Sequence, residues 1–372
     1  MAVRLNNFLA FNDFYVDFSY PKKLVKTYLK NECIKGYPRF RYKKLIILLG
    51  ANASGKTSLG QMMNRILNFI VYRSPSVLIE AVKDTTHEAE LMLDFVMTEP
   101  SPKLYRIGVR ISATASAIVP KCDVYVNNIV IRREDTYETA KKRLDASAIE
   151  YTDDYTVLNA IPALGFFFSY PSDVKPIAPR KTDSENYRTV LETILKVLDT
   201  SITGVERVQE ARNSYSIGFL GGSNVLIQNG AAINTSLLSS GTKAGIAIAD
   251  ILTAIMEHEN GFYYCDERFP YIQSDVECAV LGLMTEYLGD NEQLFFTTQN
   301  TDILSLPYPK HSYMFLKKTV LDSEIRIETL SADKYLKRNT DVLRCAVEND
   351  LFLTAPDIDK LLTLSRQNRD AE

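Results

Sequence analysis

The residue pattern with the most defined chemistry in this chain is Gly50-x-x-x-x-Gly55-Lys56-Thr57, which matches a phosphate-binding loop. Glycine lets the backbone wrap closely around a phosphate group without Cβ clashes. Lys56 would supply a point charge for the β- and γ-phosphate oxygens, and the Thr57 hydroxyl is placed to ligate Mg²⁺. The pattern therefore predicts a site for ATP and Mg²⁺. The predicted nucleotide contacts are Gly50, Ala51, Asn52, Ala53, Ser54, Gly55, Lys56, Thr57 and Ser58.

A strand must precede such a loop and a helix must follow it. Five consecutive apolar residues, Leu45 to Leu49, fit a buried parallel strand. After the loop, apolar residues recur at helical spacing over residues 58–71. Because strand, loop and helix occur in the required order, we reject the alternative of a glycine-containing turn that matches by chance.

Two adjacent acids, Asp266 and Glu267, follow a second predicted strand that begins at Phe262. A carboxylate at a strand end can share the magnesium ion of the loop, and the next one can orient or deprotonate the attacking water. We predict Thr57 and Asp266 as metal ligands, and Lys56 and Glu267 as catalytic residues.

A third pattern, Ser239-Ser240-Gly241, opens a predicted helix that runs to about Glu257. A serine cap with free backbone N–H groups behind it forms an anion-binding helix terminus. Taken alone, these residues favour a plain capped helix over an anion site.

Together with the loop and the acid pair, Ser239-Ser240-Gly241 resembles the signature motif of ABC-type ATPases. The opening Leu5-Asn-Asn-Phe8-Leu-Ala-Phe11 is similar to the start of RecF/SMC-like and AAA-family ATPases of the OLD and Septu type, and Thr298-Gln299-Asn300 resembles their switch segment. The resemblance covers roughly residues 1–330 and points to a group found in bacterial defence operons.

This resemblance implies an α/β fold of the ABC type, with a mixed sheet, a helical signature lobe and a β-meander insertion. It also implies a head-to-tail dimer or a higher oligomer of the chain with itself. In such an assembly Ser239, Ser240 and Gly241 of one subunit would bind the nucleotide held on the loop of the other.

Three positions depart from the family pattern. Gln299 stands where the switch segment normally has histidine, and Gln273 replaces a second histidine after the acid pair. No glutamine occurs between Gln61 and Gln209, so the metal-contacting glutamine of the family is missing or replaced, with Ser169 and Asp173 as alternatives. Glutamine donates hydrogen bonds but cannot shuttle a proton. We expect Gln299 to take part in catalysis through its hydrogen bonds. Because it cannot carry a proton, we expect hydrolysis to be slow.

The order of predicted elements defines the domains. Strands alternate with helices, which indicates a parallel or mixed sheet with helices on its faces. We predict an ATPase domain over 1–330 and a C-terminal helical segment over 331–372. The ATPase domain would include a basic connection at 19–44 and a β-rich insertion at 91–150, with a hairpin tip at Asn127-Asn128.

Composition limits the possible classes of protein. The chain has 372 residues, a net charge of −3 and 46% hydrophobic residues, which suits a globular protein and argues against a nucleic-acid coat. Five scattered cysteines indicate reduced thiols and a cytoplasmic location. No apolar run reaches the length of a transmembrane helix, so we expect no membrane partner.

These features favour an ATP-hydrolysing switch subunit of an anti-phage defence complex that controls a separate effector, such as a nuclease or toxin. The alternative is a DNA-repair or recombination ATPase of the RecF/SMC type that acts on DNA directly. A transporter motor is a third and weaker alternative. The Lys- and Arg-rich residues 22–44 favour contact with nucleic acid, although a solvated loop would have the same composition.

Overall fold

The structure is a computed structural model that describes residues 2–22, 28–113, 120–170, 184–209, 211–233, 238–321, 324–338 and 341–352. Its central element is a six-stranded sheet in the order β17-β16-β5-β15-β14-β9. Five neighbouring strands are parallel, and the edge strand β17 is antiparallel to β16, so the sheet is mixed as predicted. The strands are β5 (Leu45–Leu49), β9 (Phe166–Ser169), β14 (Phe262–Asp266), β15 (Gln293–Thr297), β16 (Tyr313–Leu321) and β17 (Glu324–Ser331).

Both faces of this sheet are covered, which explains the unbroken apolar run of β5. Ile46 and Leu48 belong to one buried core, while Leu45, Ile47 and Leu49 belong to another on the opposite face. A strand buried on both faces needs no polar residues at alternate positions. The sheet therefore separates two hydrophobic cores.

The first core lies between the central sheet and a five-stranded antiparallel sheet, with the order β2-β1-β6-β7-β8. Helix α1 (Lys56–Tyr72) contributes its apolar face to this core, and the short helix α2 (Ser76–Ile79) follows it. The strands are β1 (Ala2–Asn6), β2 (Phe14–Asp17), β6 (Ala89–Met97), β7 (Lys103–Ile111) and β8 (Cys122–Val130). The predicted meander is thus present, and the first two strands of the chain extend it.

The prediction of a hairpin tip at Asn127-Asn128 is wrong. Both residues lie within β8, where they pair with Arg106 and Tyr105 of β7. Asparagine favours turns only through local hydrogen bonds to its own backbone, and the long ladder between β7 and β8 outweighs that preference.

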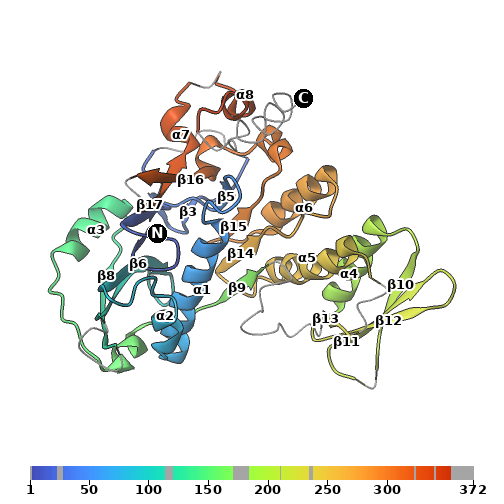
Figure 1. Cartoon of the computed structure of the whole chain (residues 1–372), viewed down its shortest axis with the longest axis horizontal. Helices are drawn as coiled ribbons and strands as arrows, with labels where there is room; N and C mark the ends of the chain where they lie inside the picture. The colour runs from blue at the N-terminus through green and yellow to red at the C-terminus, as the bar shows by residue number, and fades with distance from the viewer. Residues whose placement is uncertain are drawn as a thin grey trace, which may run out of the picture.

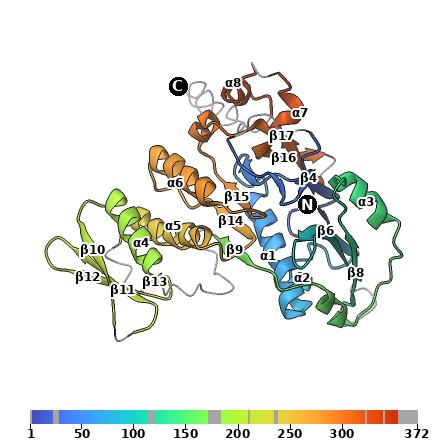
Figure 2. The same ribbon diagram turned by 180° about the vertical axis from the view of Figure 1, so that it is seen from behind.

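The second core lies on the other face, against α4 (Glu185–Leu198), α5 (Ser240–Met256) and α6 (Ser274–Tyr287). Helices α4 and α5 form a lobe with a four-stranded antiparallel sheet, and Figures 1 and 2 show this lobe on the opposite side of α1 from β8 and α3. The sheet consists of β10 (Ile202–Arg207), β11 (Ser214–Phe219), β12 (Asn224–Gln228) and β13 (Ala231–Ala232). This lobe corresponds to the predicted signature lobe.

Smaller elements complete the described chain. They are β3 (Cys33–Ile34), β4 (Tyr37–Arg41), α3 (Tyr137–Asp145), α7 (Ala332–Tyr335), α8 (Leu343–Glu348) and the 3-10 turns Tyr155–Ala160, Thr301–Ser305 and Lys310–Ser312. The C-terminal segment packs against the central sheet, because Phe352 stacks on Phe315 of β16 at a ring-centroid distance of 3.9 Å. Within the described parts of the chain, no helix is both long and apolar enough to cross a membrane.

Several cations of the basic connection have partners in the fold. Lys43 is buried and donates a 2.8 Å hydrogen bond to Ser331, and burial lowers its pKa to about 8. Lys22 lies 3.1 Å from Asp333, and Lys35 lies 3.6 Å from Asp290. Lys23 and Lys26 fall outside the described residues. Contact with nucleic acid through residues 22–44 stays a prediction.

Candidate phosphate and magnesium site

The loop between β5 and α1 has a backbone that only small residues permit. Gly55 has a φ of +104°, and a Cβ atom there would lie 2.9 Å from the Cδ1 of Ile327. A Cβ atom on Gly50 would lie 2.7 Å from the carbonyl oxygen of Leu316 in β16. Close approach to a backbone oxygen therefore requires glycine at position 50, and the left-handed backbone conformation favours glycine at position 55. The loop places α1 so that its first backbone N–H groups face the loop, as anion binding requires.

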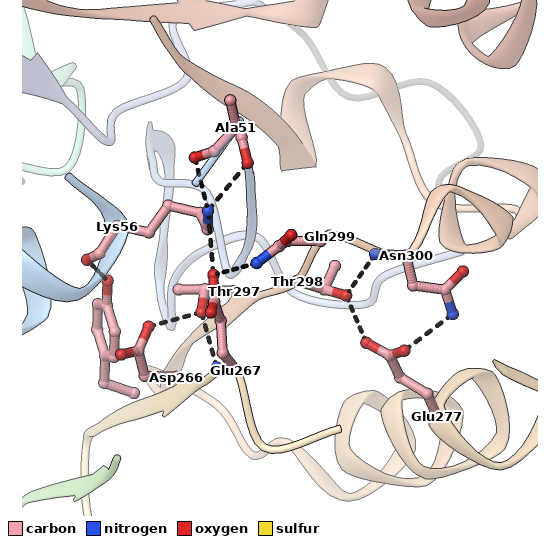
Figure 3. Close-up of polar contacts among 11 residues, drawn as sticks. Ala51, Lys56, Asp266, Glu267, Glu277, Thr297, Thr298, Gln299 and Asn300 are labelled. Carbon is pink, nitrogen blue, oxygen red and sulfur yellow. Dashed lines mark hydrogen bonds and ion pairs between the residues drawn. The ribbon is translucent and has the colours of Figure 1, made fainter. Parts of the chain in front are cut away.

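The side chain of Lys56 turns back over this loop (Figure 3). Its Nζ donates to the carbonyl oxygens of Gly50 at 2.9 Å and Ala51 at 3.3 Å, and it lies 3.0 Å from Oε1 of Glu267. The Tyr264 hydroxyl donates a 2.7 Å hydrogen bond to the Lys56 carbonyl and so ties the start of α1 to β14. The amine is thereby held at the mouth of the loop, and only 3% of the side chain is exposed.

Asp266, at the end of β14, fits a magnesium ligand. Its Oδ1 accepts a 2.7 Å hydrogen bond from Thr297, while its Oδ2 is buried and has no hydrogen-bond partner of ordinary geometry among the described residues. Burial raises the pKa of this carboxyl group, and the hydroxyls of Thr297 and Thr57 oppose the rise. A buried carboxylate oxygen without a partner is unfavourable unless a cation neutralises it. Hard oxygen ligands of this kind suit Mg²⁺, and the Thr57 hydroxyl comes from the first turn of α1, directly after the loop.

Glu267 is held in a backbone conformation that is uncommon for a non-glycine residue. Its φ is +39°, and its N–H donates to the Thr297 hydroxyl at 2.9 Å. In Figure 3 its carboxylate lies between Lys56 and Gln299, whose Nε2 donates to Oε1 at 3.2 Å. Such strain persists only where the surrounding contacts enforce it, and it occurs often at functional sites. The structure thus brings Gln299 to the predicted catalytic carboxylate.

A second layer of polar residues supports the segment that carries Gln299, and sequence reasoning missed it. Glu277 of α6 is buried and accepts hydrogen bonds from the Thr298 hydroxyl at 2.6 Å and the Asn300 amide at 2.8 Å. Asn300 also donates to Ser274 at 2.8 Å. Burial raises the pKa of Glu277. An acid within an amphipathic helix carries no sequence pattern that would reveal this contact.

The predicted signature residues lie apart from these groups. Ser239 caps α5 and accepts a 3.0 Å hydrogen bond from the backbone N–H of Thr242, and Ser240 is exposed. A Cβ atom on Gly241 would lie 3.2 Å from the Tyr271 carbonyl, so the helix terminus approaches the loop that follows the acid pair. Among the described residues, no hydrogen bond or ion pair joins residues 239–241 to the phosphate loop of the same chain.

Ser169 and Asp173 are the two alternatives for the missing family glutamine, and the structure describes only the first of them. Ser169 ends β9 beside β14 and accepts a 2.8 Å hydrogen bond from Nε of Arg268. Asp173 lies outside the described residues. Gln273 is the residue before α6, and its side chain is exposed and makes no cap hydrogen bond. A role of Ser169 in place of the family glutamine stays a prediction.

The fold is similar to that of solved ATPase head domains. One is an Smc head bound to the C-winged helix domain of ScpA, with 14% sequence identity, a TM-score of 0.51 and coverage of 90% of this chain and 98% of that chain. Others are an Smc head with a coiled coil and joint derived from Pyrococcus yayanosii (10% identity, TM-score 0.49, 90% and 98% covered) and the recombination mediator RecF (9% identity, TM-score 0.42, 88% and 97% covered). No protein-family model and no curated protein matches the chain.

The chain therefore has the ABC-type ATPase fold that the sequence predicted, with a mixed sheet and a signature-bearing helical lobe. At this low identity the likeness concerns the fold alone.

Proposed function

We propose that this chain is a Mg²⁺-dependent ATPase that turns over slowly and switches a separate effector. The observation that supports this most strongly is that one side chain from α1 meets two adjacent carboxylates at the end of β14. Lys56 at the start of α1, Asp266 at the end of β14 and Glu267 just beyond it converge, with 3.0 Å between the Lys56 amine and the Glu267 carboxylate.

Each group has one role in ATP binding. The phosphate loop wraps the β-phosphate with its backbone N–H groups, and Lys56 neutralises the β- and γ-oxygens. Thr57 and Asp266 would hold Mg²⁺, which would supply charge stabilisation for the transferred phosphoryl group. A phosphate oxygen would replace Glu267 as the partner of Lys56, which frees the carboxylate to contact water.

Hydrolysis in this arrangement depends on Glu267 as the residue that orients and deprotonates the attacking water. Gln299 already donates to this carboxylate and can fix its direction, but an amide cannot accept and release a proton. The hydrogen bonds from Thr298 and Asn300 to Glu277 fix the residues on either side of Gln299, and the lack of a proton-shuttling group at position 299 favours a modest rate.

The nucleotide would also join two subunits. Ser239, Ser240 and Gly241 lie at an exposed helix terminus that does not contact its own phosphate loop in the described chain. A head-to-tail pair would bring this terminus to the γ-phosphate on the partner, where helix N-termini bind anions. ATP would then stabilise the closed pair, and hydrolysis would release it.

An effector in anti-phage defence is the second part of the proposal. One similar head domain was solved with a winged-helix domain of another protein, so a fold of this type can carry a separate protein domain. Direct DNA binding is less well supported, because Lys22, Lys35 and Lys43 of the basic connection are engaged within the chain.

Calorimetry and ATP turnover of three variants test the ATPase. Lys56→Ala should lose ATP binding, while Glu267→Gln should bind ATP and lose turnover by about a hundredfold or more. Lys121→Ala, which removes an exposed lysine far from the loop, is the control and should behave as the unmodified chain. Unchanged ATP affinity in Lys56→Ala would disprove the site.

Co-purification from the native operon tests the effector. We expect a second protein to bind the chain in one nucleotide state only. If the chain is recovered alone, and clamps or cleaves DNA by itself with ATP, the effector proposal is wrong and the DNA-repair alternative replaces it.

A further inference from the structure

A cavity of about 490 Å³ opens at the end of the central sheet opposite to the phosphate loop. Its wall includes Phe166, Phe262 and Gln293, which are the first residues of β9, β14 and β15. The last residues of β14 and β15, Asp266 and Thr297, belong to the magnesium site. Four residue steps along a strand separate the two sites by about 13 Å. The cavity is therefore a separate site, and its volume is typical of small-molecule pockets.

The body of the cavity is apolar. Met63 comes from α1, Phe95 and Met97 come from β6, and Phe166 and Phe262 come from the central sheet. The cavity thus lies where the two sheets and α1 diverge at the margin of the first core. Aromatic and thioether side chains favour a flat aromatic or an aliphatic ligand.

The charged side chains that line the wall are mostly acidic, and the cations Lys35 and Lys44, which lie outside the lining, act electrostatically on two of them. Glu259, Asp290 and Glu292 line it, and none of the residues that line it in the described chain is a lysine or an arginine. His258 lies 3.0 Å from Glu292, and the exposed Lys35 lies 3.6 Å from Asp290 from outside the wall. Burial raises the pKa of Glu292. Carboxylates in a partly buried wall attract a cationic head group through charge-assisted hydrogen bonds.

We propose that this cavity binds a small organic amine, with an apolar, preferably aromatic, body against the methionine and phenylalanine side chains and its ammonium group toward the carboxylates. The site goes beyond the proposed ATPase and does not depend on it, because none of its wall residues belongs to the phosphate loop or to the acid pair.

Three probes with the same ring system separate charge from shape: tryptamine, the neutral tryptophol and the anionic indole-3-acetate. Binding to the full chain is followed through the methyl groups of ¹³C-labelled methionine. Met63 and Met97 line the cavity, whereas Met284 and Met256 belong to or pack against the second core and serve as internal controls. We expect tryptamine to shift the Met63 and Met97 signals and to bind about tenfold more tightly than indole-3-acetate.

Two cavity-filling variants and one charge variant complete the test. Thr98→Trp and Ala163→Trp each fill the cavity from a wall position that is not fully buried. The two positions lie on different segments, so we expect at least one variant to fold. A folded variant should no longer show the Met63 and Met97 shifts with tryptamine. Glu259→Gln should reduce the preference for the amine, and Lys56→Ala should retain full tryptamine binding. The proposal is overturned if no probe shifts Met63 or Met97 at millimolar concentration, if the anion binds as tightly as the amine, or if a folded filled variant binds tryptamine unchanged.

Discussion

At the scale of single residues, the site contains buried acids that the fold alone does not neutralise. Asp266 and Glu277 are both buried, and burial raises the pKa of each. Glu277 has two hydrogen-bond donors to compensate it, whereas Oδ2 of Asp266 has none of ordinary geometry among the described residues. Such a group stays in a protein when it has a ligand to bind, since an unpaired buried charge is destabilising.

Asp266→Asn should raise the melting temperature of the nucleotide-free chain at neutral pH. Because the pKa of Asp266 is raised in the folded chain, the folded state binds this proton more tightly than the unfolded state. The stabilisation of the folded chain by the proton on Asp266 is therefore complete below the ordinary aspartate pKa of about 4. It is lost as the pH rises through the raised pKa of the folded state. Scanning calorimetry between about pH 4 and pH 8 should show the gain of the variant shrinking toward the acid end.

The same variant should lose the extra stabilisation that ATP with Mg²⁺ provides, because it removes a metal ligand. If Asp266→Asn melts as the unmodified chain at every pH, or responds normally to Mg²⁺ and ATP, the magnesium assignment fails.

Glu277→Gln should lower kcat for ATP by about tenfold and leave KM nearly unchanged. The amide keeps the shape, but it has one acceptor oxygen where the carboxylate has two, so it can accept from either Thr298 or Asn300 and not from both, which would loosen the segment that carries Gln299. An unpaired buried donor also costs about 1–3 kcal/mol in the free energy of unfolding. Glu286→Gln, on the exposed face of the same helix, is the matched control. A change in KM alone would show that Glu277 does not position the catalytic segment.

At the scale of elements, the proposed ATPase depends on two helix termini. Both α1 and α5 begin at sites that we assign to phosphate, one in the loop between β5 and α1 and the other at Ser239. The two helices lie on opposite faces of the central sheet, because α1 packs in the first core and α5 in the second. If both assignments hold, one chain presents two anion-binding termini that face different surroundings.

Ser239→Ala should destabilise the chain by about 1 kcal/mol, since it removes the cap of α5. Thr136→Ala is the control, because Thr136 caps α3 through an equivalent hydrogen bond to Thr139, in a different part of the molecule. Both variants should show similar losses in urea unfolding. Only Ser239→Ala should weaken ATP-dependent association, and equal effects of the two variants would leave α5 as an ordinary capped helix.

At the scale of the whole molecule, the six-stranded sheet divides the chain into two cores and carries the site at one end. The exposed Tyr271 lies beside Gly241, so the surface around the α5 terminus continues into the loop that follows Glu267. A second subunit that covers this surface would bury parts of two catalytic sites at once.

Glu267→Gln with ATP and Mg²⁺ should double the mass of the chain in light scattering or mass photometry, and ADP should not. The variant keeps the shape of the side chain but removes the carboxylate, so the closed pair accumulates. An identical mass in the apo, ADP and ATP forms would indicate constitutive assembly through another surface.

A mixture of two defective chains tests the head-to-tail geometry. Lys56→Ala lacks the loop charge, and Gly241→Trp in a Glu267→Gln background blocks the signature terminus. Neither chain should pair with itself, but together they form one intact composite site. ATP-dependent association of the mixture, and of neither chain alone, is the expected result.

The elements whose structure follows from local chemistry were predicted correctly. The loop at 50–57 follows a strand and precedes a helix, and Asp266 ends another strand, as the sequence predicted, while the chemical roles of these residues stay predictions. The strand Leu45–Leu49 and the helix that follows it have the predicted bounds to within a few residues. The turn at Asn127-Asn128 failed because pairing with a distant strand outweighed local preference.

The sequence by itself determined that a phosphate loop, an acid pair and a mixed sheet exist, because a glycine-rich loop and a doubly buried strand each leave a pattern within a few consecutive residues. Only the tertiary structure decided that Glu277 supports the Gln299 segment, that Gln299 reaches Glu267, and that several cations of the basic connection serve the fold. These contacts join residues far apart in the chain, and no spacing rule encodes them. The apolar cavity belongs to the same class, since its wall is assembled from segments between Phe18 and Gln293 that meet only after the two sheets have packed.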